Sequence, residues 1–157
     1  MRVKVSNVNQ PVFKECNVHA TLPAELSKLQ EIAYNVWWSW NAGAKDLFRY
    51  IDNDAWHRAE SNPVVLLNII SYDRMVELTK DTKFMKQLDK VYSEFRAYME
   101  TPKDKKKPTI AYFSMEYGLT HVLKIYSGGL GILAGDYIKE ASDCNVDMTA
   151  IDRKSVV

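Results

Sequence analysis

The stretch from Ile110 to Asp143 decides the fold, and it begins with IAYFSMEYGL (residues 110–119). After a short loop it continues with IYSGGLG (residues 125–131) and ILAGDYIKEASD (residues 132–143). The first segment alternates small and aromatic side chains, as a buried strand does, and the last predicts a helix that begins near Gly131. Between them, three glycines within four residues predict a turn at which the backbone comes close to another group.

A helix that begins at the glycine loop points its free N–H groups and the positive end of its dipole at that loop. Phosphate is bound in this way at many helix N-termini, so an anion is a candidate ligand of Gly128, Gly129 and Gly131. The spacing is also typical of an ordinary tight turn, and on spacing alone both interpretations stay open.

The flanking residues set the boundaries of this domain. Residues 101–108 (TPKDKKKP) are charged and bounded by prolines, which predicts a solvated linker rather than a basic binding patch. Residues 146–151 (VDMTAI) predict a second strand, so strand, helix and strand form one βαβ unit with a parallel sheet. One such unit cannot cover both faces of its sheet, so residues 109–151 are expected to begin a larger, truncated domain.

The first hundred residues predict a separate helical domain. Residues 2–8 alternate valine with polar residues, which suits a short strand or an extended arm. Residues 23–99 contain several apolar stripes at helical spacing and predict an all-helical bundle within a domain of residues 1–100. The chain is therefore expected to be α/β overall, with the bundle first and the βαβ unit second.

Individual helices can be placed within the bundle. Apolar residues recur every three or four positions from Pro23 to Trp40, which predicts one helix with a single apolar face. A second short helix is expected at residues 44–51. Asn62, Ser71 and Asp81 are each placed to cap a further helix.

Three of the four tryptophans lie within four residues, at Trp37, Trp38 and Trp40. Sugar rings stack on exposed aromatic faces, so this cluster is a candidate polysaccharide-binding platform. Helical spacing favours core positions for Trp37 and Trp40, because they continue the apolar face of the predicted helix. Only Trp38 is predicted to point away from that face.

The composition is that of a soluble globular protein, with 46% hydrophobic and 26% charged residues. A net charge of +1 gives no reason to expect nucleic acid or a membrane as partner. The first residues lack the apolar segment of a signal peptide and no run is long enough to span a bilayer, which favours a cytoplasmic location. Cys16 and Cys144 lie at opposite ends of the chain and the histidines are scattered, so neither a disulfide nor a metal site is predicted.

Several motifs point to one family. SMEYGL (residues 114–119), YSGGLG (126–131) and AGDYIKEASD (134–143) resemble the start of the catalytic region of bacterial α-glucan phosphorylases. NVWWSWN (35–41) and NPVVLL (62–67) resemble the extra domain that precedes this region in the maltodextrin-type branch. The resemblance covers nearly the whole chain, and it implies that the βαβ unit begins a Rossmann-like glycosyltransferase domain of the GT-B type.

The resemblance implies an activity and a site. An α-glucan phosphorylase transfers the terminal glucose of an α-1,4-glucan to inorganic phosphate, with a pyridoxal phosphate cofactor whose phosphate acts as proton donor and acceptor. The glycine loop would lie against the cofactor phosphate and the sugar phosphate, with the N–H groups of Gly129 and Leu130 as donors. Gly128 and Gly131 are expected to permit the turn. Glu116 matches a glutamate of the family motif and is expected to order the cofactor pocket, with a turn or helix-cap acceptor as the alternative.

The resemblance also shows what to expect elsewhere. The cofactor lysine and further phosphate-binding residues belong to the second lobe of the family fold, and no part of this chain matches them. We therefore assign no catalytic residue and expect the chain by itself to be inactive. Residues 120–124 (THVLK) depart from the family pattern, so no sugar contact is assigned there and His121 is expected to be a loop residue. A homo-oligomer is compatible with the resemblance.

Two other functions stay open. Glycogen and starch synthases share the two-Rossmann-domain architecture and have a Lys-x-Gly-Gly-Leu loop. Lys124 lies four residues ahead of Gly128, which is the wrong spacing for that motif. Alternatively, residues 1–100 form a non-catalytic helical module that binds glucan or a neighbouring subunit.

Residues 152–157 (DRKSVV) are expected to be a non-native tail. The family would continue after the second strand with an apolar, glycine-rich segment, which is missing here. The codons GAT CGG AAG AGC GTC GTG would encode this tail, and they match the start of a common sequencing adapter whose next triplet is a stop. The natural sequence is therefore expected to continue beyond Ile151.

Overall fold

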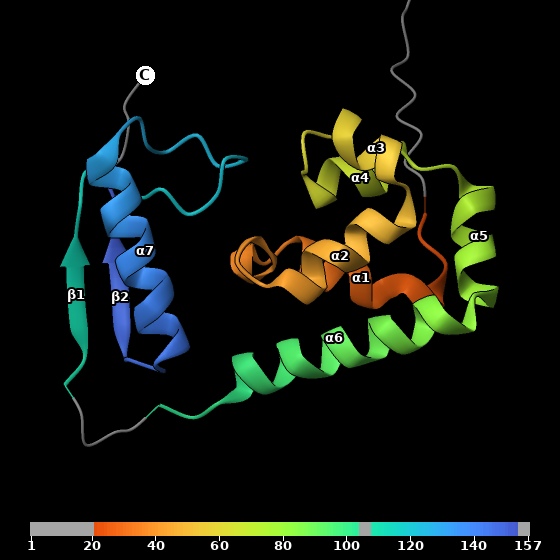
Figure 1. Cartoon of the computed structure of the whole chain (residues 1–157). Coiled ribbons are helices and arrows are strands. Elements are labelled where there is room, and N and C mark those ends of the chain that lie inside the picture. Colours follow the sequence, from red (N-terminus) through yellow and green to blue (C-terminus); the bar gives the residue numbers. More distant parts are fainter. Residues whose placement is uncertain (1–20, 104–107, 154–157) are drawn as a thin grey trace, which may run out of the picture.

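The computed structural model describes residues 21–103 and 108–153 of the chain. They form two parts that lie side by side, a helical bundle and a smaller βαβ unit (Figure 1). The extended segment predicted at residues 2–8, Cys16 and the last four residues of the predicted tail lie outside the described residues. Bundle and βαβ unit follow one another in the order that the sequence predicts.

In the part described, the bundle consists of six α-helices and two short 3-10 helices. Helix α6 lies along one side of α1 and α2, while α3 and α4 lie along their other side (Figure 1). The bounds are η1 (Ala24–Leu26), α1 (Ser27–Ala33), η2 (Val36–Ser39), α2 (Ala42–Ile51), α3 (Asn53–Arg58), α4 (Pro63–Ile69), α5 (Tyr72–Lys80) and α6 (Thr82–Glu100).

Side-chain caps explain where most of these helices begin. The side chains of Asn62, Ser71 and Asp81 accept hydrogen bonds from backbone N–H groups in the first turns of α4, α5 and α6. Asn41 and Asp52 do the same for α2 and α3. Each cap contributes about 1 kcal/mol, because it satisfies a donor that has no partner inside the helix. The three predicted caps are confirmed, whereas helix α3 is not among the predicted helices.

The bundle encloses its core. Phe48 and Phe84 have no exposed surface, and the ring of Phe48 stacks on Trp56 with the centroids 6.1 Å apart. Burying one large apolar side chain stabilises the fold by about 1.5–3 kcal/mol. On α6 the buried side chains recur at the predicted helical spacing. They are Phe84, Leu88, Val91 and Phe95.

The single helix predicted from Pro23 to Trp40 is wrong. Helix α1 ends at Ala33, and Asn35 then takes an extended backbone conformation with φ −108° and ψ 125°. The side chain of Asn35 accepts a hydrogen bond from the N–H of Trp37 at 3.0 Å and so begins the separate turn η2. Asparagine favours such breaks because its short side chain competes for backbone donors.

This break reverses the prediction for Trp38. Trp37 and Trp38 are both only 3% exposed, whereas Trp40 is partly buried. Trp38 packs edge-on against Trp56, with the centroids 6.2 Å apart, and Trp37 packs against Phe95 at 5.4 Å. In a 3-10 turn successive side chains are about 120° apart, so the helical face predicted for residues 23–40 does not continue. Trp38 is a core residue and cannot serve as an exposed sugar platform.

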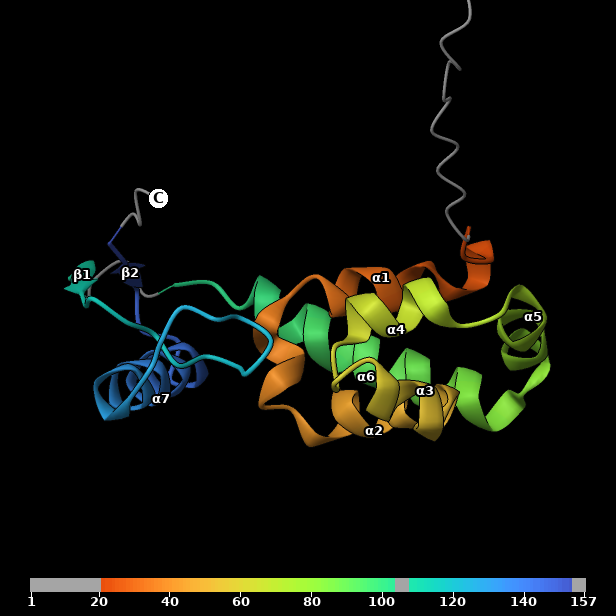
Figure 2. The same ribbon diagram turned by 90° about the horizontal axis from the view of Figure 1, so that it is seen from above.

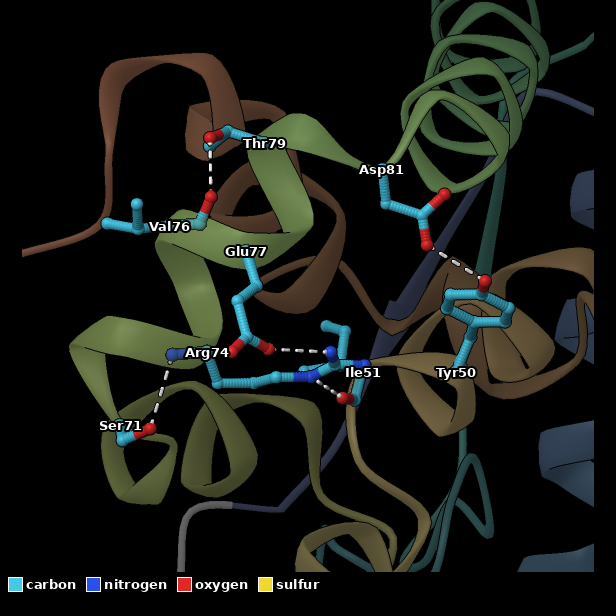
Figure 3. Close-up of polar contacts among 8 residues, drawn as sticks. All are labelled: Tyr50, Ile51, Ser71, Arg74, Val76, Glu77, Thr79 and Asp81. Carbon is cyan, nitrogen blue, oxygen red and sulfur yellow. Dashed lines mark hydrogen bonds and ion pairs between the residues drawn. The ribbon is translucent and has the colours of Figure 1, made fainter.

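A polar junction joins the end of α2 to α5 and to the start of α6 (Figure 3). The Nε of Arg74 donates to the carbonyl of Ile51 at 3.0 Å, which satisfies an acceptor at the C-terminus of α2. The hydroxyl of Tyr50 donates to Asp81 at 2.9 Å, so the carboxylate that caps α6 also binds α2. The N–H of Phe84 and then Tyr50 hold the pKa of Asp81 below its ordinary value.

The second part consists of β1 (Ile110–Phe113), α7 (Gly129–Asp143) and β2 (Met148–Ile151). The strands are parallel, with Ile110 opposite Met148 and Phe113 opposite Ile151, and α7 packs against β2. The predicted βαβ order and parallel sheet are confirmed, and α7 begins two residues before the expected position. The described chain is thus mostly helical with a small parallel sheet, which is an α/β arrangement in the broad sense.

Two kinds of feature are absent from the residues that the structure describes. None of their helices combines the length and the apolar composition that crossing a membrane requires. Within the same residues, no three His, Cys, Asp or Glu side chains come together in a way that could hold a metal ion.

Candidate functional site

The candidate site lies where β1 ends and α7 begins (Figure 1). After Phe113 the chain forms a loop and returns to the start of α7 at Gly129, beside the end of the strand. Tyr117 anchors this loop, because it is only 2% exposed and its hydroxyl donates to the carbonyl of Tyr112 at 2.6 Å. Open α/β sheets bind ligands outside the carboxyl ends of their strands, which is the edge at which this loop lies.

Glu116 ties the loop to the start of α7. Its carboxylate accepts hydrogen bonds from the hydroxyl of Ser127 at 2.8 Å and from the N–H of Ser127 at 3.2 Å. These two donors, and to a smaller extent the N–H groups of Gly128 and Gly131, hold the pKa of Glu116 below its ordinary value, although burial acts in the opposite direction. The negative charge lies at the positive end of the helix dipole, so this contact is the helix-cap role that the sequence left as an alternative.

Two glycines of α7 are needed for close packing. A Cβ at Gly131 would lie 2.5 Å from the Cβ of Tyr126, and one at Gly135 would overlap the carbonyl oxygen of Gly118. The N–H of Gly118 also donates to the carbonyl of Gly131 at 2.7 Å. The first turns of α7 therefore lie against the loop almost backbone to backbone, which only glycine allows.

Gly128 and Gly129 have open space around them instead. A Cβ at either position would meet no atom within 4 Å. Gly128 is extended, with φ −153° and ψ −163°, and no described glycine has a positive φ. The expectation that Gly128 and Gly131 permit a turn is therefore wrong, because packing requires Gly131 and the backbone at Gly128 suits any residue. Open space beside a glycine is what a ligand needs to approach the backbone closely.

The first turn of α7 offers two adjacent backbone donors. The N–H groups of Gly129 and Leu130 have no partner inside the helix, and among the described residues they make no other backbone hydrogen bond. Glu116 lies against Ser127 and the neighbouring N–H groups and leaves these two donors open. The arrangement can hold one anionic oxygen through backbone donors and the helix dipole.

A hollow of about 420 Å³ opens beside the loop. Among its lining residues are Glu116 and Lys124, which bring one negative and one positive charge. Asp152 and Arg153 also line it, but they belong to the predicted tail, so we assign them no role. A cluster of several phosphate charges would need more cations than Lys124 supplies.

The opposite end of α7 is tied to the bundle by three residues that we call the α7 anchor: Trp40, Tyr98 and Asp143. Asp143 accepts hydrogen bonds from the indole N–H of Trp40 at 3.1 Å and from the hydroxyl of Tyr98 at 2.6 Å. Burial and the bond to Asp143 raise the pKa of Tyr98 to about 12, so the hydroxyl stays a donor at neutral pH. An aspartate at the end of a helix faces the negative end of the dipole, and the two donors offset that repulsion.

The sequence gives little sign of this anchor. Asp143 follows Trp40 by 103 residues and Tyr98 by 45 residues, so no local pattern connects them. The one available signal is an acidic residue at a helix C-terminus. His121 makes a further contact with the bundle, with its Nε2 2.7 Å from the carbonyl oxygen of Glu60, and it lies in a loop as expected.

A family model described as "Protein of unknown function (DUF3417)" matches residues 22–123. The chain belongs to this family. The match includes the whole described bundle and ends just before the glycine loop. Membership of the DUF3417 family therefore characterises the bundle more than the candidate site.

Over most of its length this DUF3417 chain is also similar to phosphorylases. It is 43% identical to the maltodextrin phosphorylase of Thermococcus litoralis in an alignment of 141 residues that covers 85% of this chain and 17% of that protein. It is 39% identical to the glycogen phosphorylase of Mycobacterium tuberculosis over 151 residues (88% of this chain, 18% of that protein). The glycogen phosphorylase of Aquifex aeolicus is 42% identical over 126 residues (78% and 18%).

The resemblance to α-glucan phosphorylases that the motifs indicate is thus confirmed for most of the chain. The chain spans less than a fifth of the length of these relatives. No solved structure gives a significant match.

Proposed function

We propose that this chain is the N-terminal portion of an α-glucan phosphorylase, which transfers the terminal glucose of an α-1,4-glucan to inorganic phosphate and gives glucose 1-phosphate. The observation that carries the proposal is the identity to maltodextrin and glycogen phosphorylases. An alignment that covers 88% of the chain has to extend from the bundle into the βαβ unit. The likeness is therefore not confined to one of the two parts.

In this proposal, residues 1–100 are an N-terminal helical domain, residues 101–108 a linker and residues 109–151 the start of a Rossmann-like domain of the GT-B type. Two parallel strands joined by a crossover helix are the repeating element of such domains. Phe113 and Ile151, on neighbouring strands, are 71% and 37% exposed, which suits a sheet that further elements cover. The enzyme would act in the cytoplasm.

The N–H groups of Gly129 and Leu130 bind a phosphate oxygen in this enzyme. The lack of backbone partners for these donors, the open space at Gly129 and the helix dipole support the assignment. Glu116 does not contact that phosphate, because two anions at short range repel each other. Glu116 instead positions the loop through Ser127, and Gly131 holds α7 against the same loop.

Pyridoxal phosphate is the cofactor that the proposed family implies. When bound, its phosphate supplies proton transfer next to the substrate phosphate. The described residues fit the phosphate end of this cofactor, since two free backbone donors and open space at Gly128 and Gly129 accept an oxyanion without displacing a side chain. The lysine that carries the cofactor is not assigned to any residue of this chain.

Phosphorolysis by the complete gene product tests the proposal. We expect release of glucose 1-phosphate from maltoheptaose that depends on both inorganic phosphate and pyridoxal phosphate. Residues 1–157 alone serve as the control, and should give neither product nor a borohydride-stable cofactor adduct at a single lysine. Glucose transfer from a nucleotide sugar, without phosphorolysis, would identify a synthase and overturn the proposal.

A further inference from the structure

A groove between α1 and α4 takes no part in the phosphate site. We call it the α1–α4 groove, and Figure 2 shows the two helices lying side by side. It has a volume of about 300 Å³ and is lined on one side by Ser27, Gln30 and Tyr34. These residues are three and four positions apart, so they share one face of α1 and its C-terminal cap. Leu67 and Asn68 of α4 contribute to the other side.

Among the residues that the structure describes, the polar side chains of the groove have no hydrogen-bond partner. The side chains of Ser27, Gln30, Tyr34 and Asn68 make no hydrogen bond to any described residue. The carboxamides of Gln30 and Asn68 can each donate and accept hydrogen bonds, and so can the hydroxyls of Ser27 and Tyr34. Tyr34 is 70% exposed, so its ring is accessible to a ligand in the groove. Buried Leu67 adds an apolar surface to the lining.

The groove is also uncharged. None of its described lining residues is Asp, Glu, Lys or Arg, although these make up 26% of the chain. The hollow beside the glycine loop differs, because Glu116 and Lys124 line it. An anionic or cationic ligand would find no counter-charge in the α1–α4 groove. A purely apolar ligand would leave the carboxamides of Gln30 and Asn68 without partners, which is costly once they are buried.

One ligand class satisfies all of these groups. A neutral sugar presents hydroxyls that match carboxamides and an apolar ring face that packs on an aromatic side chain. The geometry points to a carbohydrate-binding site in the α1–α4 groove, with Tyr34 as the stacking platform and Gln30 and Asn68 as the hydrogen-bonding groups. That the sugar is an α-1,4-glucan rests on the proposed function.

A site on the bundle would hold the glucan away from the phosphate loop. Two attachment points on one polymer raise the effective concentration of its reactive end at the second point. The groove should therefore increase the affinity for long glucans, whereas short oligosaccharides that cannot reach both points should bind no more tightly. The groove would give the bundle the glucan-binding role for which the sequence offered the cluster of Trp37, Trp38 and Trp40 as a candidate.

Titration of the 157-residue chain with maltoheptaose, followed by calorimetry or NMR, tests the inference without any need for turnover. We expect binding in the millimolar range or tighter, and weakening of about tenfold in Tyr34→Ala. Gln30→Ala should weaken binding as well. Tyr72→Ala is the matched control, because Tyr72 is 58% exposed on α5 and does not line the groove. Thermal unfolding shows whether each variant is folded.

Three results would overturn the inference: no binding of maltoheptaose by the unaltered chain, equal weakening in Tyr34→Ala and Tyr72→Ala, or a preference for cellohexaose. The outcome is separable from that of the proposed function. If the complete enzyme shows no phosphorolysis but Tyr34→Ala still weakens sugar binding, the binding site in the groove is supported and the proposed activity is wrong. If phosphorolysis occurs and Tyr34→Ala binds maltoheptaose normally, the proposed activity is supported and the binding site in the groove is wrong.

Discussion

The bundle and the βαβ unit differ in how far their largest apolar side chains are exposed to solvent. Phe48 and Phe84 are fully buried in the bundle, whereas Phe113 on β1 and Leu133 on α7 are 71% and 70% exposed. Exposed apolar surface of this kind marks a face that another element or partner covers. The two parts of the described chain therefore differ in what they expose. The bundle has a closed core, and the βαβ unit exposes apolar side chains and the backbone donors of Gly129 and Leu130.

The largest expected effect is on the core of the bundle. Phe84→Ala should lower the free energy of unfolding of the 157-residue chain by about 3–5 kcal/mol, because it leaves a cavity in a closed core. Phe113→Ala removes the same ring from an exposed strand and should change it by less than about 0.5 kcal/mol. Urea unfolding followed by circular dichroism measures both. Equal losses for the two variants would mean that the βαβ unit encloses a core of its own.

The next effect separates two kinds of glycine within the βαβ unit. Gly129→Ala should reduce phosphorolysis by the complete enzyme on the order of a hundredfold, because the new methyl group meets the bound phosphate. Its melting temperature should not fall, since the methyl group has open space in the free protein. Gly131→Ala should instead lower the unfolding free energy by about 1–3 kcal/mol, because the methyl group clashes with Tyr126.

Steady-state kinetics and thermal unfolding of both glycine variants decide between these roles. Normal turnover and phosphate dependence in Gly129→Ala would show that the loop is a structural turn. Gly128→Ala is a useful companion, because its Cβ also meets no protein atom and any loss of turnover then reports on the ligand.

A smaller effect is expected where the two parts meet. Tyr98→Phe removes one donor of the α7 anchor and should lower the unfolding free energy by about 1 kcal/mol. Trypsin should also cleave residues 101–108 of this variant faster, because the two parts then separate more often. Tyr72→Phe provides the control, since its hydroxyl makes no hydrogen bond to a described residue. Unchanged stability and cleavage in Tyr98→Phe would mean that the anchor does not hold the parts together.

The smallest effect is a shared pH dependence at two helix starts. The pKa values of Asp81 in the bundle and Glu116 in the βαβ unit are both held below their ordinary values. Each carboxylate therefore contributes stability that is present above its ordinary pKa and is lost as the pH falls through its lowered pKa. The stability difference between the unaltered chain and Asp81→Asn or Glu116→Gln should shrink between pH 6 and pH 3, roughly the range of carboxyl titration. A difference that stays constant with pH would contradict ionised caps.

Local signals predicted much of the fold. Asn62, Ser71 and Asp81 were assigned correctly as caps, because a cap acts on backbone donors two or three residues away. The βαβ order followed from strand and helix patterns that are also local. Asn35 carries the same capping signal, but the apolar spacing around it predicts an uninterrupted helix, and the prediction for Trp38 fails for that reason.

The candidate site was predictable only in part. Residues 128–131 were singled out by composition, yet the sequence could not distinguish the packed Gly131 from the open Gly129. That distinction depends on Gly118 and Tyr126, which reach α7 through the fold of the loop. The α7 anchor lay beyond any local pattern, because its bonds join residues that are distant in the chain.

The two ends of helix α7 contact different parts of the molecule. Its 15 residues make a rod of roughly 22 Å, with Asp143 bound to the bundle at one end and Gly129 at the other end, beside the loop that packs on Gly131. A rotation of about 3° at the anchor would move the first turn by about 1 Å, a displacement that can cost a site on the order of a hundredfold in rate. We therefore expect the hydrogen bonds of Asp143 to Trp40 and Tyr98 to influence how accurately the N–H groups of Gly129 and Leu130 are placed.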